Sequence, residues 1–175
     1  MKTILLAGSS IFQQWGNAAG IAPDAVVRNR AIGGTVTSYW LEHLARMLMD
    51  ESPDAVLFYC GSNDVSREIP EAEIVANVLG CRRILQDQSW TARMAYFSII
   101  KAPQKKGNWD LIDRLNCAIR EGLFDGDLYV ETNAVFFRDE CPVTRLFVED
   151  GLHLTDRAYV ELSEYARPHI SAWLD

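Results

Sequence analysis

Short, almost wholly apolar runs alternate with longer amphipathic segments along the chain, and this alternation constrains the fold more than any other feature. Five such runs have the length of strands, and they cover residues 2–8, 25–30, 54–61, 92–100 and 127–132. Hydrophobicity that is continuous rather than alternating is typical of parallel strands buried on both faces. The sequence therefore predicts a parallel sheet that lies between two layers of helices.

The intervening segments carry apolar residues at helical spacing. They predict helices over residues 37–51, 68–87 and 108–123, and Thr155 is expected to cap a last one. Right-handed crossovers favour a flavodoxin-like strand order 2-1-3-4-5, with strand 1 between strands 2 and 3. With 175 residues, 49% of them hydrophobic, we predict one three-layer α/β/α domain over residues 1–175.

The charge balance argues against two classes of partner. The formal net charge is −7 and there is no cluster of lysine and arginine, so we expect neither nucleic acid nor an anionic membrane surface as a partner. The longest basic run, Lys105–Lys106, is expected to lie on the surface of a loop.

The apolar run Ile4–Ala7 is shorter than the roughly 7–15 residues of a signal-peptide core. No membrane span is expected either, and we predict a cytoplasmic protein.

The cysteines do not form a metal-binding pattern. None of the four belongs to a CxxC pair, and no histidine stands at ligand spacing from them; they are Cys60, Cys81, Cys117 and Cys141. We expect reduced, mostly buried thiols. The sequence predicts neither a metal site nor an organic cofactor.

Polar residues and glycines follow three strands that the predicted order makes neighbours. Gly8–Ile11 (GSSI) follows the first strand, Asn29–Gly34 (NRAIGG) the second and Cys60–Asp64 (CGSND) the third. Ligands of such sheets bind beyond the carboxyl ends of the strands, where the winding reverses. A serine can supply a nucleophilic hydroxyl, while glycine N–H groups and an asparagine amide can stabilise an oxyanion. These residues are what acyl transfer needs, apart from a base.

The stretch Asp150–Thr155 (DGLHLT) offers that base. His153 could accept the serine proton, and Asp150 could hold the imidazole in the required tautomer. Alone, an Asp-x-x-His spacing is more often a loop in which the aspartate accepts hydrogen bonds from backbone N–H groups. The motifs gain weight because they occur together, in order, at successive strand ends.

In this order the four motifs resemble the conserved blocks of the GDSL/SGNH hydrolases, from Ser10 to His153. The resemblance implies the SGNH hydrolase fold, with Ser10 as nucleophile, His153 as general base and Asp150 as its partner. It also implies that the N–H groups of Ser10 and Gly34 and the side chain of Asn63 form the oxyanion hole. Phe97–Pro103 (FSIIKAP) resembles the loop after strand 4 in bacterial members.

Two departures from the family pattern keep alternatives open. Ser9 stands where the family usually has aspartate, which makes Ser9 a rival nucleophile; Ala31 stands where glycine is common. Gly33 is an alternative to Gly34 as oxyanion donor, and Glu149 is a weaker alternative to Asp150.

Other conspicuous residues are expected to be structural. We expect packing roles for Trp15, Trp40, Trp90 and Trp173. Trp109 could line a substrate pocket, but packing at a helix start is favoured. Asp64 is assigned a structural role because no histidine lies near it in sequence.

The favoured function is a serine esterase or acylhydrolase that acts on small-molecule esters. Short acyl or acetyl groups are preferred, because the chain has no large insertion that could form a lid over the site. A thioesterase or a lysophospholipase-type acylhydrolase would use the same site.

A flavodoxin-like binding module is disfavoured by the lack of a phosphate-binding GxGxxG or GxxxxGK[ST] motif. An α/β-hydrolase elbow would require glycine where Phe12 stands. A pseudoenzyme is disfavoured because every candidate catalytic side chain is present. The sequence makes no prediction about oligomeric state.

Overall fold

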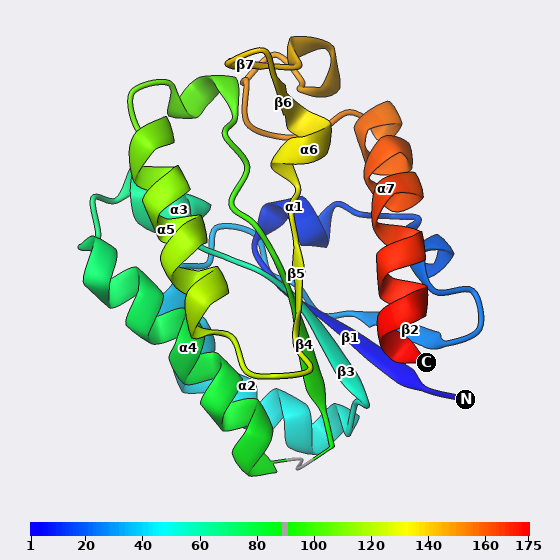
Figure 1. The fold of residues 1–175 in the computed structure, drawn as a ribbon. Coiled ribbons are helices and arrows are strands. Elements are labelled where there is room, and N and C mark those ends of the chain that lie inside the picture. Colours follow the sequence, from blue (N-terminus) through cyan, green and yellow to red (C-terminus); the bar gives the residue numbers. More distant parts are fainter. Residues whose placement is uncertain (89–90) are drawn as a thin grey trace.

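The computed structural model of the protein describes residues 1–88 and 91–175, and its centre is a sheet of five parallel strands (Figure 1). The strands are β1 (Thr3–Gly8), β2 (Val26–Asn29), β3 (Ala55–Tyr59), β4 (Arg93–Phe97) and β5 (Leu128–Val130). Their order is β2-β1-β3-β4-β5, so β1 pairs with both β2 and β3. The predicted three-layer fold and strand order are confirmed.

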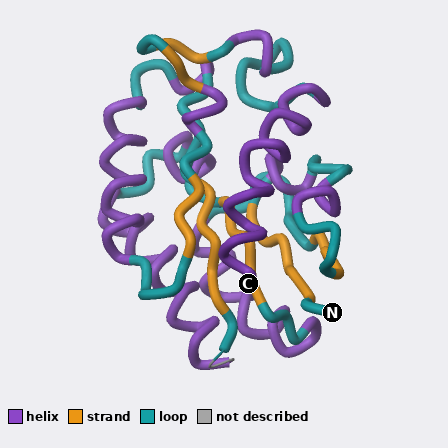
Figure 2. The backbone as a smooth tube through the Cα atoms, turned by 45° about the vertical axis from the view of Figure 1, so that its right-hand side comes forward, coloured by secondary structure: helices purple, strands orange, loops and turns teal. Residues whose placement is uncertain are grey.

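Helices cover both faces of the sheet (Figures 1 and 2). One face carries α2 (Thr37–Glu51), α4 (Glu71–Gln88) and α5 (Trp109–Gly122). The other carries α7 (Asp156–Leu174) and the 3₁₀ helix η1 (Ala18–Ile21). The alternation of side chains along each strand divides the core accordingly: in β1, Ile4 and Leu6 belong to the α7 side, and Leu5 and Ala7 to the α2–α4 side.

The predicted starts of the long helices can be compared with the structure. The α2 helix spans the predicted residues 37–51. Thr155 is the N-cap of α7, since its hydroxyl accepts a hydrogen bond from the N–H of Ala158 at 3.2 Å. Pro70, predicted inside the first turn of the 68–87 helix, instead precedes α4, and its carbonyl accepts the N–H groups of Glu73 and Ile74.

Several short elements between the long ones were not predicted. They are α1 (Ser10–Gln13), α3 (Ser62–Ser66), η2 (Pro103–Lys105), α6 (Asn133–Phe136), η3 (Thr144–Leu146) and a hairpin of β6 (Phe137–Arg138) and β7 (Cys141–Pro142). They are too short to show a hydrophobic period. Most of them lie beyond the carboxyl ends of the sheet strands (Figure 1).

Three expectations about burial were wrong. The edge strand β2 is not covered on both faces, and Val26 is 40% exposed. Only two of the four thiols are buried, since Cys117 and Cys141 are exposed. Lys105 does not lie on the surface of its loop: its exposed fraction is 3%, whereas Lys106 is exposed.

The tryptophans that the structure describes have packing roles. Trp15 and Trp40 are buried, and Trp173 donates its indole N–H to the carbonyl of Gly126. The indole N–H of Trp109 donates to the carbonyl of Ala102 at 3.0 Å, as expected for packing at a helix start. Trp90 lies outside the described residues. Within residues 1–88 and 91–175, no helix combines the length and the apolar character needed to cross a bilayer.

Candidate active site

The turn after β1 presents Ser10 at the start of α1. Gly8 has a φ of +140°, and a Cβ there would lie 2.0 Å from the carbonyl oxygen of Tyr59 on β3. Only glycine permits this close approach. The N–H of Ser9 donates to the same Tyr59 oxygen at 3.0 Å, which ties the exit of β1 to its neighbour. Ser10 follows as a half-buried residue.

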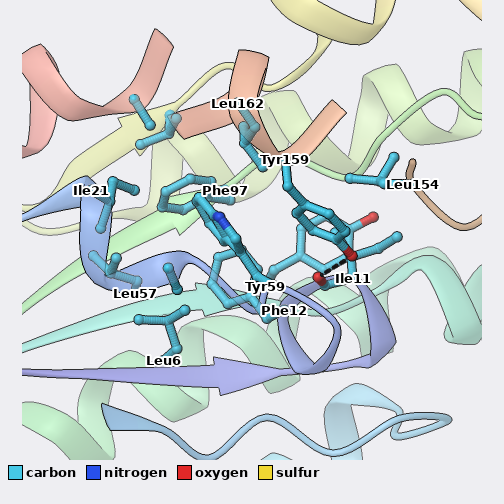
Figure 3. Close-up of a cluster of buried hydrophobic side chains, with 14 of the residues drawn as sticks. Leu6, Ile11, Phe12, Ile21, Leu57, Tyr59, Phe97, Leu154, Tyr159 and Leu162 are labelled. Carbon is cyan, nitrogen blue, oxygen red and sulfur yellow. Dashed lines mark hydrogen bonds between the residues drawn. The ribbon is translucent and has the colours of Figure 1, made fainter. Parts of the chain in front are cut away.

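Buried side chains of the core hold the turn that carries Ser10 in place. Ile11 and Phe12 lie in the core, and the hydroxyl of Tyr159 on α7 donates to the carbonyl of Ile11 at 2.8 Å (Figure 3). Phe12 also packs against Trp15 and Tyr59 with ring centroids 5.4 and 5.6 Å apart. The position of Ser10 therefore depends on core packing on the α7 side of the sheet.

The loop after β2 lies against the Ser10 turn. Asn29 donates its amide to the carbonyl of Phe12 at 2.6 Å, and its Oδ1 accepts from the N–H of Ala31 at 3.1 Å. A Cβ on Gly33 would lie 3.7 Å from the Cβ of Ser10, so this glycine borders the nucleophile candidate. Gly34 has a φ of +76°. Within residues 1–88 and 91–175, no hydrogen bond occupies the backbone N–H of Ser10 or of Gly34.

The turn after β3 contributes Asn63 on α3. Its side-chain amide donates to the carbonyl of Thr35 at 2.9 Å, and an amide nitrogen carries a second N–H beyond this one. Asn63 does not cap α3, because the N-cap residue is Gly61. Asp64 is buried and accepts the N–H of Thr37 at 2.9 Å, at the start of α2. These contacts support the structural role expected of Asp64 and join the exits of β2 and β3.

The residues from Phe147 to Leu154 form a loop stabilised by its own backbone. Val148 and His153 are joined by a 2.9 Å hydrogen bond from the Val148 N–H to the His153 carbonyl. Oδ1 of Asp150 accepts from the N–H groups of Leu152 and His153 at 2.8 and 2.9 Å. One carboxylate oxygen of Asp150 thus accepts the backbone N–H groups of the loop, which is the usual role of an aspartate at such a position, and the other oxygen is not needed for it.

The second oxygen of Asp150 faces the imidazole. Nδ1 of His153 lies 2.5 Å from Oδ2 of Asp150, and Nε2 lies 3.0 Å from Oγ of Ser10. Since a carboxylate can only accept, Nδ1 carries a proton, and this tautomer leaves Nε2 to accept from the Ser10 hydroxyl. Residues 143 positions apart in the chain thus meet in one hydrogen-bonded series.

The Asp150 carboxylate is ionised, and both it and the His153 ring are partly exposed. The hydrogen bond from His153, with those from the two N–H groups, lowers the pKa of Asp150 from its ordinary 3.8 to about 2. The Asp150 side chain is 44% exposed and that of His153 is 28% exposed. Asp150 therefore stays ionised at neutral pH, in a site that is open to water.

The geometry separates the favoured residues from their alternatives. Ser9 is 2% exposed, and the imidazole contacts the hydroxyl of Ser10. Glu149 is exposed, whereas Asp150 contacts His153. Gly33 and Gly34 both lie in the β2 loop. Within the described parts of the chain, no group of three or more His, Cys, Asp or Glu side chains could hold a metal ion.

Two positioning residues were not anticipated from the sequence. Asn29 links the β2 loop to the Ser10 turn, and Thr35 provides the carbonyl that holds Asn63. Asn29 stands inside the NRAIGG motif, two residues before Ala31, which is a spacing typical of an asparagine that accepts a nearby backbone N–H. Nothing in the sequence indicates the role of Thr35, which depends on the pairing of β1 with its two neighbours.

The chain is similar to proteins of known fold. A structure from Streptococcus pneumonia, provisionally described as a platelet activating factor, matches with a TM-score of 0.84 and 20% identity, over 95% of this chain and 83% of that one. A protein from Bacteroides fragilis, provisionally described as an acylhydrolase, matches with a TM-score of 0.83 and 17% identity, over 99% and 88%. An acetylxylan esterase from Geobacillus stearothermophilus matches with a TM-score of 0.78 and 15% identity, over 98% and 94%. At these identities the likeness establishes the fold alone.

Sequence comparison gives the family. No curated protein matches the chain. The family model of the GDSL-like lipase/acylhydrolases, enzymes that act on ester bonds, matches residues 7–160, a range that includes all four motifs. The chain therefore belongs to the GDSL-like lipase/acylhydrolase family.

Proposed function

We propose that the protein is a serine hydrolase that cleaves carboxylic esters through an acyl-enzyme, with Ser10, His153 and Asp150 as its catalytic triad. The observation that carries the proposal is the unbroken series of contacts from Oγ of Ser10 to Nε2 of His153 and from Nδ1 to Oδ2 of Asp150. A nucleophile within hydrogen-bond reach of a base that a third group orients is the arrangement that activates a serine.

Each step of the proposed cycle has a group to perform it. His153 accepts the proton as Ser10 Oγ attacks the ester carbonyl, and the imidazolium is stabilised by the ionised Asp150. The proton passes to the leaving alcohol as the C–O bond breaks, which leaves the acyl group on Ser10. A water molecule then attacks the acyl-enzyme with His153 again as base, and the acid is released.

The oxyanion is assigned to three donors. They are the N–H of Ser10, the N–H of Gly34 and the side-chain amide of Asn63. In support, the two backbone N–H groups make no hydrogen bond within the described residues, and Asn63 uses one of its two N–H groups on Thr35. Neutral donors held in place before the reaction stabilise the developing charge without reorganisation.

Small acyl groups, such as acetyl, are the preferred substrates in this proposal. The partly exposed triad and the fold likeness to an acetylxylan esterase support this choice. A buried methylene would contribute about 0.8 kcal/mol, but an open site gives a long chain little apolar surface to contact. Thioesters and lysophospholipids are the alternatives, because the same groups would attack either carbonyl.

A chain-length series tests both parts of the proposal. Hydrolysis of para-nitrophenyl esters from acetate to octanoate is measured with the wild type and Ser10→Ala, together with labelling by a fluorophosphonate. We expect Ser10-dependent labelling, and a kcat/KM that does not rise from acetate to octanoate. A steep rise would favour a lipid acylhydrolase, and labelling that persists in Ser10→Ala would reject the nucleophile.

A further inference from the structure

The turn after β4 lies between the two halves of the candidate site. On one side, the N–H of Gln104 in η2 donates to the carbonyl of Gly151 at 2.9 Å, and a Cβ on Gly151 would lie 3.2 Å from the Cβ of Pro103. Gly151 stands between Asp150 and His153 in sequence. On the other side, Lys105 of η2 reaches α3, the helix that carries Asn63. The turn after β4 therefore contacts both the loop that carries Asp150 and His153 and the helix that carries Asn63.

Lys105 is buried without a counter-charge. Its exposed fraction is 3%, and its ammonium donates to the hydroxyl of Ser66, one turn after Asn63 on α3. Within residues 1–88 and 91–175, no carboxylate oxygen lies within 4.0 Å of this ammonium. Lys101, in the same segment, shows the usual arrangement, since its ammonium lies 3.0 Å from Asp113.

The hydrogen-bonding capacity around Lys105 is not filled. An ammonium has three donors, and the Ser66 hydroxyl accepts one of them. Burial lowers the pKa of Lys105, and no neighbouring acid offsets this effect. An acceptor with negative charge would satisfy both the donors and the charge.

Arg67 adds a second cation beside the same helix. Its guanidinium donates to the carbonyl of Gly34 at 3.1 Å, so it lies next to a candidate oxyanion donor. In the part of the chain that the structure describes, no carboxylate lies within 4.0 Å of Arg67 either. Lys105 and Arg67 thus place two positive charges beside α3, the helix that also carries the buried carboxylate of Asp64.

We propose that Lys105, assisted by Arg67, binds an anionic group of the ester substrate, so that the substrates are esters carrying a carboxylate or a phosphate. The inference rests on the proposed function, because it concerns the molecule that Ser10 attacks. The lysine side chain has a flexible four-carbon stem, which allows the ammonium to move from Ser66 to the ligand. Lys105 is here a specificity residue that has no part in bond cleavage.

Matched ester pairs test the proposal. One pair is para-acetoxybenzoate and its methyl ester, which place or remove a charge on the leaving group. The other is the mono-para-nitrophenyl ester of adipate and its methyl ester, which do so on the acyl group. Each kcat/KM is divided by the rate of hydroxide-catalysed hydrolysis, to correct for intrinsic reactivity. In the wild type we expect the anionic member of at least one pair to be preferred by about 10-fold to 100-fold, the range of a hydrogen bond to a charged group.

Lys105→Met removes the charge and keeps an unbranched apolar stem, and Lys106→Met is the control at the exposed neighbouring position. We expect Lys105→Met to abolish the preference, with little change for the neutral esters and an equal or higher melting temperature, because an uncompensated buried charge is lost. Lys106→Met should behave as the wild type, and Arg67→Met should reduce the preference in part.

Two outcomes would overturn the inference. Equal treatment of anionic and neutral esters by the wild type would reject it without any variant. A preference that survives in Lys105→Met, together with a lower melting temperature, would make Lys105 a structural link between η2 and α3. In both cases Ser10-dependent cleavage of the neutral esters would leave the proposed function intact. If no ester is cleaved and Ser10 is not labelled, the proposed function itself is rejected.

Discussion

The two halves of the candidate site are held in place by different means. Ser10, Gly34 and Asn63 follow three paired strands, and the turn that carries Ser10 rests on the buried side chains of Ile11 and Phe12. Asp150 and His153 lie on the loop from Phe147 to Leu154. Their side chains are 44% and 28% exposed, and Oδ1 of Asp150 accepts from two N–H groups of the same loop. The nucleophile half thus depends on the sheet and its core, whereas the base half depends on local hydrogen bonds.

This difference predicts two kinds of mutational response. Substitutions of the residues that hold the nucleophile half in place should lower both stability and activity, because the same contacts serve both. Changes in the Asp150–His153 loop should affect activity with little loss of stability, since exposed contacts contribute little to the free energy of unfolding.

The largest effect is expected at Ser10. Ser10→Ala should lower kcat/KM for para-nitrophenyl acetate by about 10⁶, as loss of a triad nucleophile does in other serine hydrolases. Because the hydroxyl is not part of the core, the melting temperature should stay within about 2 °C of the wild type. Ser9→Ala is the control, and activity lost there but kept in Ser10→Ala would reverse the assignment.

Asp150→Asn tests the base half. Asn keeps an oxygen that can accept from the N–H groups of Leu152 and His153, but it cannot hold Nδ1 of His153 protonated as a carboxylate does. We expect kcat to fall by about 10³–10⁴ with little change in melting temperature. Glu149→Gln should be active. A large loss in Glu149→Gln, with activity kept in Asp150→Asn, would move the triad acid to Glu149.

Asn63 tests the nucleophile half, where activity and stability should change together. Asn63→Ala removes a donor to the oxyanion, which should cost about 10²–10³ in kcat. It also removes the 2.9 Å hydrogen bond to Thr35, which contributes about 0.5–1.5 kcal/mol. Asn63→Asp should be worse in kcat, because a carboxylate would face both the Thr35 carbonyl and the developing negative charge.

Measuring kcat and melting temperature for both Asn63 variants separates the two roles. Retained kcat with a lowered melting temperature would make Asn63 a purely structural link between the β2 and β3 loops. Asn29→Ala is an informative comparison, since Asn29 holds the Ser10 turn through the carbonyl of Phe12 without being a candidate oxyanion donor.

The fold could be predicted where the hydrophobic period extends over a long segment, and contacts within the candidate site could be predicted where both partners lie in one short motif. The α2 helix appeared at its predicted boundaries, with Trp40, Leu44 and Leu48 recurring every four residues on its buried face. The strand order followed from the number of parallel units and their handedness. The Asp150–His153 contact could be predicted because both partners lie within one motif.

What the sequence could not give depends on long-range contacts or on segments without a period. The burial of Lys105 is a property of how η2 packs between α3 and the Asp150 loop, and a pair of lysines alone predicts a solvated position. The β6–β7 hairpin has two residues in each strand, too few for an alternating pattern. The exposure of β2 follows from its place at the edge of the sheet.

The smallest expected effect is an acid-dependent loss of stability from the base half. The pKa of Asp150 is about 2 in the folded protein and 3.8 ordinarily, so the unfolded chain binds the proton first as the pH falls. The stability that the ionised carboxylate contributes is present above about pH 4 and is lost as the pH falls through 2. Since the side chain is 44% exposed, this contribution is about 1 kcal/mol or less, equivalent to roughly 2–4 °C at most.

The measurement is the difference in melting temperature between the wild type and Asp150→Asn, followed from pH 6 to pH 2. The difference is needed because Arg145 and Arg157 also lower the pKa of Glu161 to about 2, and this second group titrates in both proteins and cancels. We expect a small advantage of the wild type at pH 6 that shrinks between pH 4 and pH 2. An advantage that is several times larger, or that does not change with pH, would mean that Asp150 is coupled to the core as the turn that carries Ser10 is, and that the two halves of the site are not held differently.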